Sequence, residues 1–109
     1  MKYGMNLLLW SDGLNDNLLP VLESLKKMGY DGVELPMFEL DLEKYTRWGK
    51  RLDDLGLERT AVTIRTGENN PISPDASVRR KGIDATKLTL DCCQAVGAKT
   101  IVGPYHSAI

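Results

Sequence analysis

Residues 28–35 read MGYDGVEL, and they decide the fold because the same short pattern returns as LGLERTAV at 55–62 and as VGAKTIV at 96–102. Each copy joins the end of a helical pattern, a glycine and an apolar segment. A glycine just past the last helical turn adopts the left-handed conformation that ends a helix, and a short link then begins a strand. The pattern therefore predicts a repeated helix–strand unit.

Three helices precede these glycines. Pro20 is tolerated only in a first turn, so the first regular helix is predicted to begin near Leu19. For the third helix we expect Ser73 as the cap, Pro74 at the first helical position and Asp75 beside the positive end of the helix dipole. Apolar stripes at helical spacing predict the buried faces of the first two helices: Leu14, Leu18, Leu22 and Leu25, then Leu42, Tyr45, Trp48, Leu52 and Leu55.

Four mostly apolar strands are predicted at residues 2–9, 32–35, 59–64 and 100–103, which gives the order βαβαβαβ. Successive strands joined by helices should be parallel neighbours with right-handed crossovers. Two α/β architectures fit this order: an open doubly wound sheet, or the first half of an eight-stranded barrel. Both collect ligand sites at the carboxyl ends of the strands.

Composition excludes several classes of partner. The 109 residues carry a formal net charge of -1, so no basic field is expected to hold nucleic acid, and no segment approaches membrane-spanning length. The segment after the first strand lacks the glycine spacing of a phosphate-binding loop. Cys92 and Cys93 are adjacent in a helical pattern and cannot easily pair. Two thiols of this kind are typical of small core residues in a reducing cytoplasm, which is the predicted location.

Polar and aromatic residues at the strands define the candidate site. Asn6 and Glu34 interrupt apolar strands, and burying either without a partner would cost about 1–3 kcal/mol. An internal hydrogen bond and a ligand both remain open as that partner. Trp10 is either a core residue or an aromatic wall for a sugar ring. His106 follows Tyr105 in the last loop, where an imidazole could bind substrate, move a proton or ligate a metal.

Beyond these residues, the sequence resembles a known superfamily. Residues 70–108, NPISPDASVRRKGIDATKLTLDCCQAVGAKTIVGPYHSA, resemble the third helix and fourth strand of sugar isomerases and epimerases with a xylose-isomerase-like TIM barrel, particularly the D-tagatose/D-psicose 3-epimerase group. GMNLLLWS at 4–11, MGYDGVELP at 28–36 and LGLERTAV at 55–62 resemble its first three strands. The resemblance covers essentially the whole chain.

The resemblance implies a (βα)8 barrel, of which residues 1–109 form the N-terminal half as one domain, apparently truncated after the fourth strand. In that family a divalent metal (Mn, Co or Mg) is held by two Glu, an Asp and a His from later strands, so no metal ligand and no catalytic residue is expected here. The metal polarises a ketose, and two glutamates exchange the C3 proton through an enediolate with inversion. The 109 residues alone are expected to be inactive.

What the resemblance transfers to this chain is a substrate wall, made of Asn6, Trp10, Glu34, Gly103, Tyr105 and His106. The implied substrate is a small sugar or a polyol-derived compound. Asn6 replaces an aromatic residue frequent in ketohexose epimerases, and the Arg65-Thr66-Gly67 turn also differs, so inosose dehydratase and hydroxypyruvate isomerase remain alternatives. Endonuclease-IV-like repair fits less well, because it uses metal-binding histidines at earlier strand ends and a basic surface.

A non-catalytic half-barrel used for binding or assembly is the remaining alternative. Four parallel strands would leave two sheet edges open, including groups that further strands normally cover. We therefore expect a homo-oligomer, or association through the exposed edges.

Overall fold

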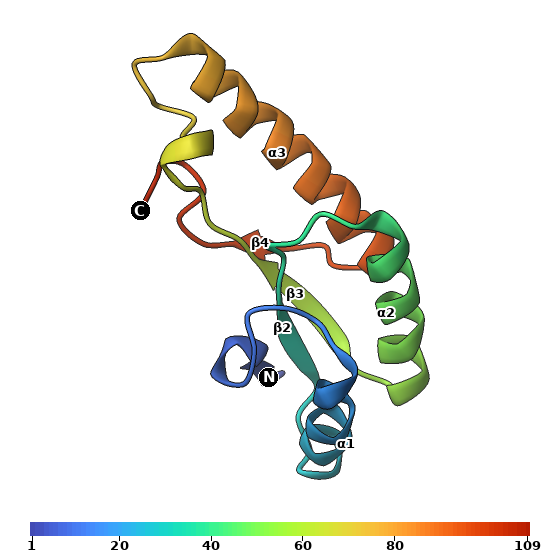
Figure 1. Cartoon of the computed structure of the whole chain (residues 1–109). Coiled ribbons are helices and arrows are strands. Elements are labelled where there is room, and N and C mark those ends of the chain that lie inside the picture. Colours follow the sequence, from blue (N-terminus) through green and yellow to red (C-terminus); the bar gives the residue numbers. More distant parts are fainter.

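The computed structural model describes residues 1–109 and contains one sheet of four parallel strands with three α-helices (Figure 1). The strands are β1 (Gly4–Asn6), β2 (Gly32–Pro36), β3 (Glu58–Val62) and β4 (Ile101–Val102). The helices are α1 (Leu19–Lys27), α2 (Leu42–Leu55) and α3 (Ala76–Val96), with short 3-10 turns η1 (Leu7–Leu9), η2 (Asp16–Leu18) and η3 (Gly67–Asn69).

The order of the strands in the sheet decides between the two predicted architectures. The sheet runs β1-β2-β3-β4, so spatial order equals chain order. A doubly wound sheet reverses direction at a switch point, whereas a barrel continues in one direction. The chain therefore has the architecture of the first half of a TIM barrel, as predicted.

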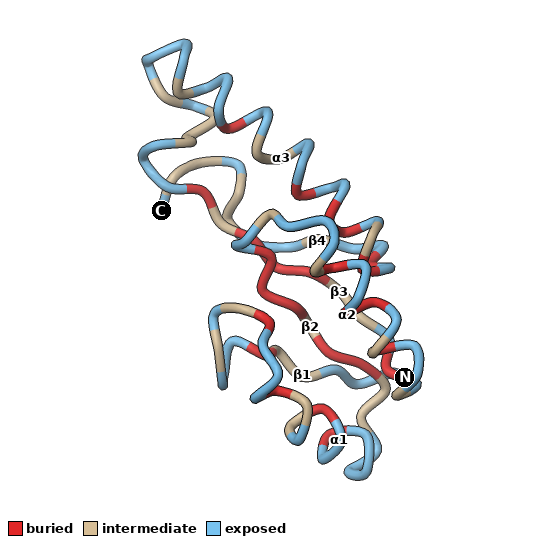
Figure 2. The backbone as a smooth tube through the Cα atoms, turned by 45° about the vertical axis from the view of Figure 1, so that its right-hand side comes forward, coloured by how far each residue is buried: buried red, intermediate tan, exposed pale blue.

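The helices pack along one face of this sheet and leave the other face open (Figures 1 and 2). Val33 and Leu35 point from β2 toward the helices and are buried in one apolar cluster. The leucine stripe of residues 14–25 belongs to the same cluster, which confirms that prediction. No helix in the chain is both long enough and apolar enough to span a lipid bilayer.

The repeated glycines end the helices as the sequence predicted. Gly56 and Gly97 follow α2 and α3 with φ of 69° and 80°, in the left-handed region. Helix α1 begins at Leu19, also as predicted. In α2, Tyr45, Trp48 and Leu52 are buried, but Leu42 is 44% exposed because the packed part of the stripe begins one turn later.

Several predicted boundaries were wrong: the third strand ends at Val62 and not at residue 64, the fourth is shorter than predicted, and two further shifts have a clear local cause. The first strand ends at Asn6 and not at Leu9, because the Asn6 Oδ1 accepts a hydrogen bond from the Leu8 N–H (2.8 Å) and turns residues 7–9 into η1. Helix α3 begins at Ala76, two residues later than expected. Its cap is Asp75, whose Oδ1 accepts a hydrogen bond from the Ser77 N–H (2.8 Å). Local side-chain acceptors thus moved both boundaries.

The two cysteines behave as core residues. Cys92 and Cys93 are free thiols and both are buried within the cluster that α3 contributes to the core. Burial raises the pKa of each thiol. Both side chains therefore remain protonated and serve packing, as predicted.

Arg59 joins β3 to the two helices that cover it. Its Nε–H donates to the Val96 carbonyl (2.7 Å) and its Nη2 to the Gly49 carbonyl (2.6 Å), while Nη1 bonds the Leu57 carbonyl (3.0 Å). The Asp53 carboxylate completes the set as an ion-pair partner. One guanidinium therefore satisfies carbonyl groups on three different segments.

Replacing Arg59 by methionine is expected to lower the free energy of unfolding by about 2–3 kcal/mol, since the charge-assisted hydrogen bonds that join β3 to α2 and α3 are lost. Urea unfolding followed by circular dichroism measures this loss. The matched control is Lys2→Met, which removes an exposed ion pair with Glu58 and should produce no measurable change. Equal effects of the two substitutions would contradict the bridging role of Arg59.

Candidate functional site

Three polar side chains form a row across the open face of the sheet. Asn6 is paired in register with Glu34, and Glu34 with Thr60, so the three residues stand side by side on β1, β2 and β3. Because side chains alternate along a strand, Glu34 points away from the helices that bury Val33 and Leu35. We call Asn6, Glu34 and Thr60 the polar row.

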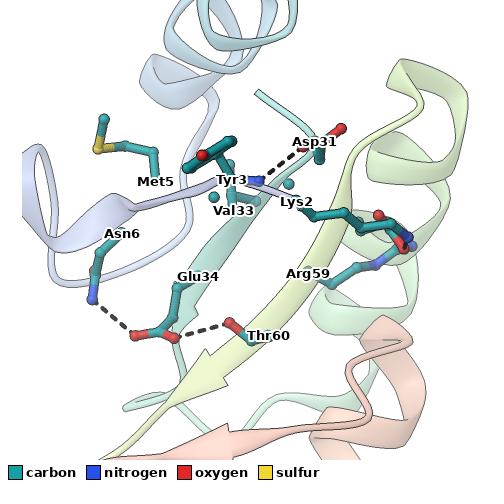
Figure 3. Close-up of a pocket in the computed structure, with 12 residues that line it drawn as sticks. Lys2, Tyr3, Met5, Asn6, Asp31, Val33, Glu34, Arg59 and Thr60 are labelled. Carbon is teal, nitrogen blue, oxygen red and sulfur yellow. Dashed lines mark hydrogen bonds and ion pairs between the residues drawn. The ribbon is translucent and has the colours of Figure 1, made fainter. Parts of the chain in front are cut away.

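Hydrogen bonds fix the carboxylate at the centre of the polar row (Figure 3). Asn6 Nδ2 donates to Glu34 Oε1 (3.0 Å), and Thr60 Oγ1 donates to Glu34 Oε2 (2.9 Å). Glu34 is half-buried and belongs to none of the ion pairs of the chain. Each oxygen has one neutral donor and retains capacity to accept a second hydrogen bond from the open side.

The predicted need of Asn6 and Glu34 for polar partners is thus met by each other and by Thr60. Sequence reasoning left an internal bond and a ligand open, and the internal bond exists. Thr60 was not foreseen. Glu34 stands five residues after Gly29 but Thr60 only four after Gly56, so the repeat does not align them. Only the strand register brings them together.

The polar row lines a hollow of about 550 Å³ on the open face, which extends toward the amino ends of the strands (Figure 3). Gly4 and Gly32 line it without contributing side chains. Ligand sites of barrels lie at the opposite, carboxyl ends of the strands. We therefore interpret this hollow as space for side chains of a closed barrel, and the polar row as the boundary between the hollow and the strand ends.

The other predicted wall residues do not bond to the polar row: Tyr105 and His106 belong to the loop after β4, whereas Trp10 lies beside α1. Trp10 follows η1, is 48% exposed and borders a groove beside α1, together with Val21 and Met28. Tyr105 is half-buried and its N–H donates to the Gly103 carbonyl (3.0 Å), while His106 is exposed. Their contact with substrate stays a prediction.

Gly103 has a steric function that its sequence position did not reveal. Its φ is +117°, and a Cβ at this position would overlap the carbonyl oxygen of Thr63. Only glycine lets the end of β4 approach the end of β3 this closely. Gly103 thus places the loop that carries Tyr105 and His106.

Metal binding by this chain alone finds no support in its side chains. No group of three or more His, Cys, Asp or Glu residues is arranged to hold a metal ion. Glu34 is a single carboxylate whose neighbours in the polar row are an amide and a hydroxyl. The residues present therefore do not form the ligand set of a divalent metal, and the expected position of that set in later strands stays a prediction.

The Asn6→Asp variant tests whether positions 6 and 34 are adjacent, because two neighbouring carboxylates make the free energy of unfolding depend on pH. Two carboxylates about one hydrogen bond apart repel, which raises the folded-state pKa of the pair. The free energy of unfolding should then be about 1–3 kcal/mol below wild type at neutral pH. This deficit should shrink as the pH falls, because the folded state takes up a proton more readily than the unfolded state.

Thermal unfolding between neutral pH and pH values near the carboxyl range of about 4 measures the effect. The control is Asn6→Ala, which removes the same bonds without adding a charge. Identical pH profiles for the two variants would show that positions 6 and 34 are not adjacent.

Comparisons with known proteins agree with this fold. The profile of a family described as xylose isomerase-like TIM barrel matches residues 22–108. No match was found among curated protein sequences. Among solved structures, D-allulose 3-epimerase from Methylomonas sp., in complex with D-allulose, is 20% identical with a TM-score of 0.85, and the similarity covers 100% of this chain and 38% of that chain.

Two other solved structures give the same result. A D-psicose 3-epimerase studied in the presence of D-fructose is 27% identical with a TM-score of 0.82, covering 99% of this chain and 38% of that one. An L-ribulose 3-epimerase is 22% identical with a TM-score of 0.83, covering 99% and 37%. This chain thus spans well under half the length of these enzymes. With the profile match and the one-directional strand order, the chain belongs to the xylose isomerase-like TIM barrel family, and its fold is the first half of that barrel.

Proposed function

We propose that this chain is the N-terminal portion of a sugar isomerase or epimerase. The reaction takes place at a stereocentre next to the carbonyl of a ketose. The main support is that the entire chain superposes on the first part of sugar 3-epimerases, at TM-scores of 0.82–0.85. One of these enzymes was solved in complex with D-allulose and another in the presence of D-fructose, both of which are small free sugars. A small sugar is accordingly the proposed ligand class.

Within this function, the polar row binds the sugar from the open face of the sheet. Glu34 accepts hydrogen bonds from sugar hydroxyls through the capacity its oxygens retain on the open side, and Asn6 and Thr60 keep the carboxylate in place. Trp10, Tyr105 and His106 flank the sugar at the strand ends, and Gly103 sets the position of the last loop. These residues bind and orient; none of them is assigned the proton transfer.

The acid and base of the reaction, and the ligands of the divalent metal (Mn, Co or Mg) that the family resemblance implies, belong to the strands that would complete the barrel. The 109 residues by themselves are therefore proposed to be inactive. The two buried free thiols suit a reducing compartment, and we place the enzyme in the cytoplasm.

The test begins with the polypeptide that carries this sequence in its source cell. Its intact mass is measured first, and the purified protein is then incubated in D2O with Mn²⁺ and a panel of free and phosphorylated ketoses. Incorporation of deuterium at C3, read by NMR, is the expected result. A mass equal to the 12.1 kDa of this chain, or no exchange with any ketose by a longer protein, would contradict the proposal.

Glu34→Gln in the same polypeptide tests the polar row. Loss of a hydrogen bond to a charged group is worth about 1.5–3 kcal/mol, so kcat/KM should fall roughly 10- to 150-fold. The matched control, Glu23→Gln on the outer surface of α1, should leave kcat/KM unchanged. Equal kcat/KM values for the two variants would remove Glu34 from the substrate wall.

A further inference from the structure

Arg65 is a charged side chain in an unusual position. It follows β3 at the carboxyl end of the sheet, yet it is only 3% exposed. None of the ion pairs of the chain includes it, so its positive charge has no carboxylate partner. Buried arginine is normally paired, and this exception calls for a physical role.

The guanidinium is held entirely by neutral oxygen atoms. Its Nη1 donates to the Ile64 carbonyl (2.6 Å) and to Thr63 Oγ1 (3.3 Å). Its Nη2 donates to Thr86 Oγ1 (2.9 Å) and Thr89 Oγ1 (3.3 Å), both on α3. The Nε–H is buried without any partner. Four of the five donors therefore fix the plane of the guanidinium between β3 and α3.

The threonine acceptors are themselves oriented. The hydroxyls of Thr86 and Thr89 donate to the α3 carbonyls of Gly82 and Ala85, at 3.0 and 2.8 Å. Because each hydroxyl has one proton and that proton is committed to the helix, its lone pairs are left to face Arg65. Helix α3 thus presents two oriented hydroxyl acceptors to the guanidinium.

The same residue is attached to the last loop of the chain. The Arg65 carbonyl accepts a hydrogen bond from the Ile109 N–H (3.3 Å), and Arg65 and Ala108 form an isolated parallel bridge. Asn70 Oδ1 supports this contact by accepting from the Ala108 N–H (3.1 Å). Burial lowers the pKa of Arg65, and a charge on Tyr105 would act in the opposite direction.

We propose that Arg65 is a positioning residue that holds the loop after β4, residues 103–109, at the carboxyl ends of the strands by fixing the end of β3 against α3. Its side chain bonds β3 to α3, and its main chain pairs with Ala108 and Ile109. The consequence for sugar binding rests on the proposed function, because that loop contains Tyr105 and His106. The hold on the loop does not depend on any ligand.

The test uses hydrogen–deuterium exchange with mass spectrometry, without sugar or metal. In Arg65→Met, a peptide covering residues 103–109 should exchange at least about tenfold faster, while a peptide covering 31–37 in β2 keeps the wild-type rate. Arg65→Lys should give an intermediate rate, because an ammonium cannot reach all four acceptors. Thr89→Val is the milder second variant in case Arg65→Met fails to fold. It should show the same selective acceleration to a smaller degree.

The matched control is Arg80→Met, which removes an exposed arginine on α3 that pairs with Asp84 and should leave both peptides unchanged. Unchanged exchange of residues 103–109 in the Arg65 and Thr89 variants would overturn the proposal, as would equal acceleration of both peptides. Since no sugar is present, a negative result here is separate from failure of the proposed enzymatic function.

Discussion

Replacing Gly32 by alanine is expected to disrupt the centre of the sheet and to lower the free energy of unfolding by about 2–3 kcal/mol or more. Gly32 is paired with Glu58 across β2 and β3, and a Cβ at position 32 would lie 2.5 Å from the Glu58 carbonyl oxygen. The obstacle is main chain in the neighbouring strand, so no side-chain rotation can relieve it. For a domain whose total stability is about 5–15 kcal/mol, this is a large share.

Urea unfolding of Gly32→Ala measures the loss. Gly67→Ala is the matched control, because a Cβ at position 67 meets nothing within 4 Å, and its effect should stay within about 0.5 kcal/mol. Similar midpoints for the two variants would mean that β2 and β3 do not approach each other as described. The same outcome would also remove the register that aligns Glu34 with Thr60.

The 109-residue chain purified alone is expected to self-associate in a concentration-dependent manner. Strands β1 and β4 are the edges of the sheet, and their outer main-chain groups have no strand partner. Apolar side chains are exposed near both edges, with Trp10 at 48% beside α1 and Leu90 at 51% beside the segment that leads into β4. Pairing of edges would cover both kinds of surface.

Sedimentation analysis over a range of concentrations should give species above the 12.1 kDa monomer. Val102→Lys, on the edge strand β4, should raise the dissociation constant about tenfold or more, because a charged side chain disfavours edge pairing. Ile72→Lys is the control, since Ile72 is 68% exposed but lies outside the sheet. A monomer at all concentrations would instead favour a self-contained binding module.

Much of the fold could be predicted because it depends on local signals. The glycine after each helix, the leucine stripe and Pro20 specify where helices end, which side they bury and where the first one begins. Two of the wrong boundaries arose where two local signals compete. At residues 6–9 an apolar run suggests a strand, but the Asn6 side chain caps a turn. At residues 73–76 both Ser73 and Asp75 are able caps, and the carboxylate prevailed.

The candidate site was predictable only in part. Asn6 and Glu34 were recognisable because a polar residue in an apolar strand needs a partner, and this argument uses sequence alone. That the two residues are each other's partners, with Thr60 as a third member, depends on the offset between strands. Nothing in the spacing of residues along the chain encodes that offset. Arg65 was visible as a residue at a strand end, but its burial beneath the last loop was not.

The sequence by itself determined the helix–strand repeat and the parallel sheet, because helix caps and apolar periodicity act over a few residues. It narrowed the architecture to two alternatives, half a barrel or an open sheet. The tertiary structure alone decided the spatial order of the strands, the polar row centred on Glu34 and the neutral hydrogen-bond acceptors around Arg65. The polar row, and the contacts of Arg65 with α3, join residues more than 20 positions apart. Their geometry arises when the strands pair in register and the helices pack on one face of the sheet, which sets the side chains that meet between β3 and α3 and those that meet on the open face.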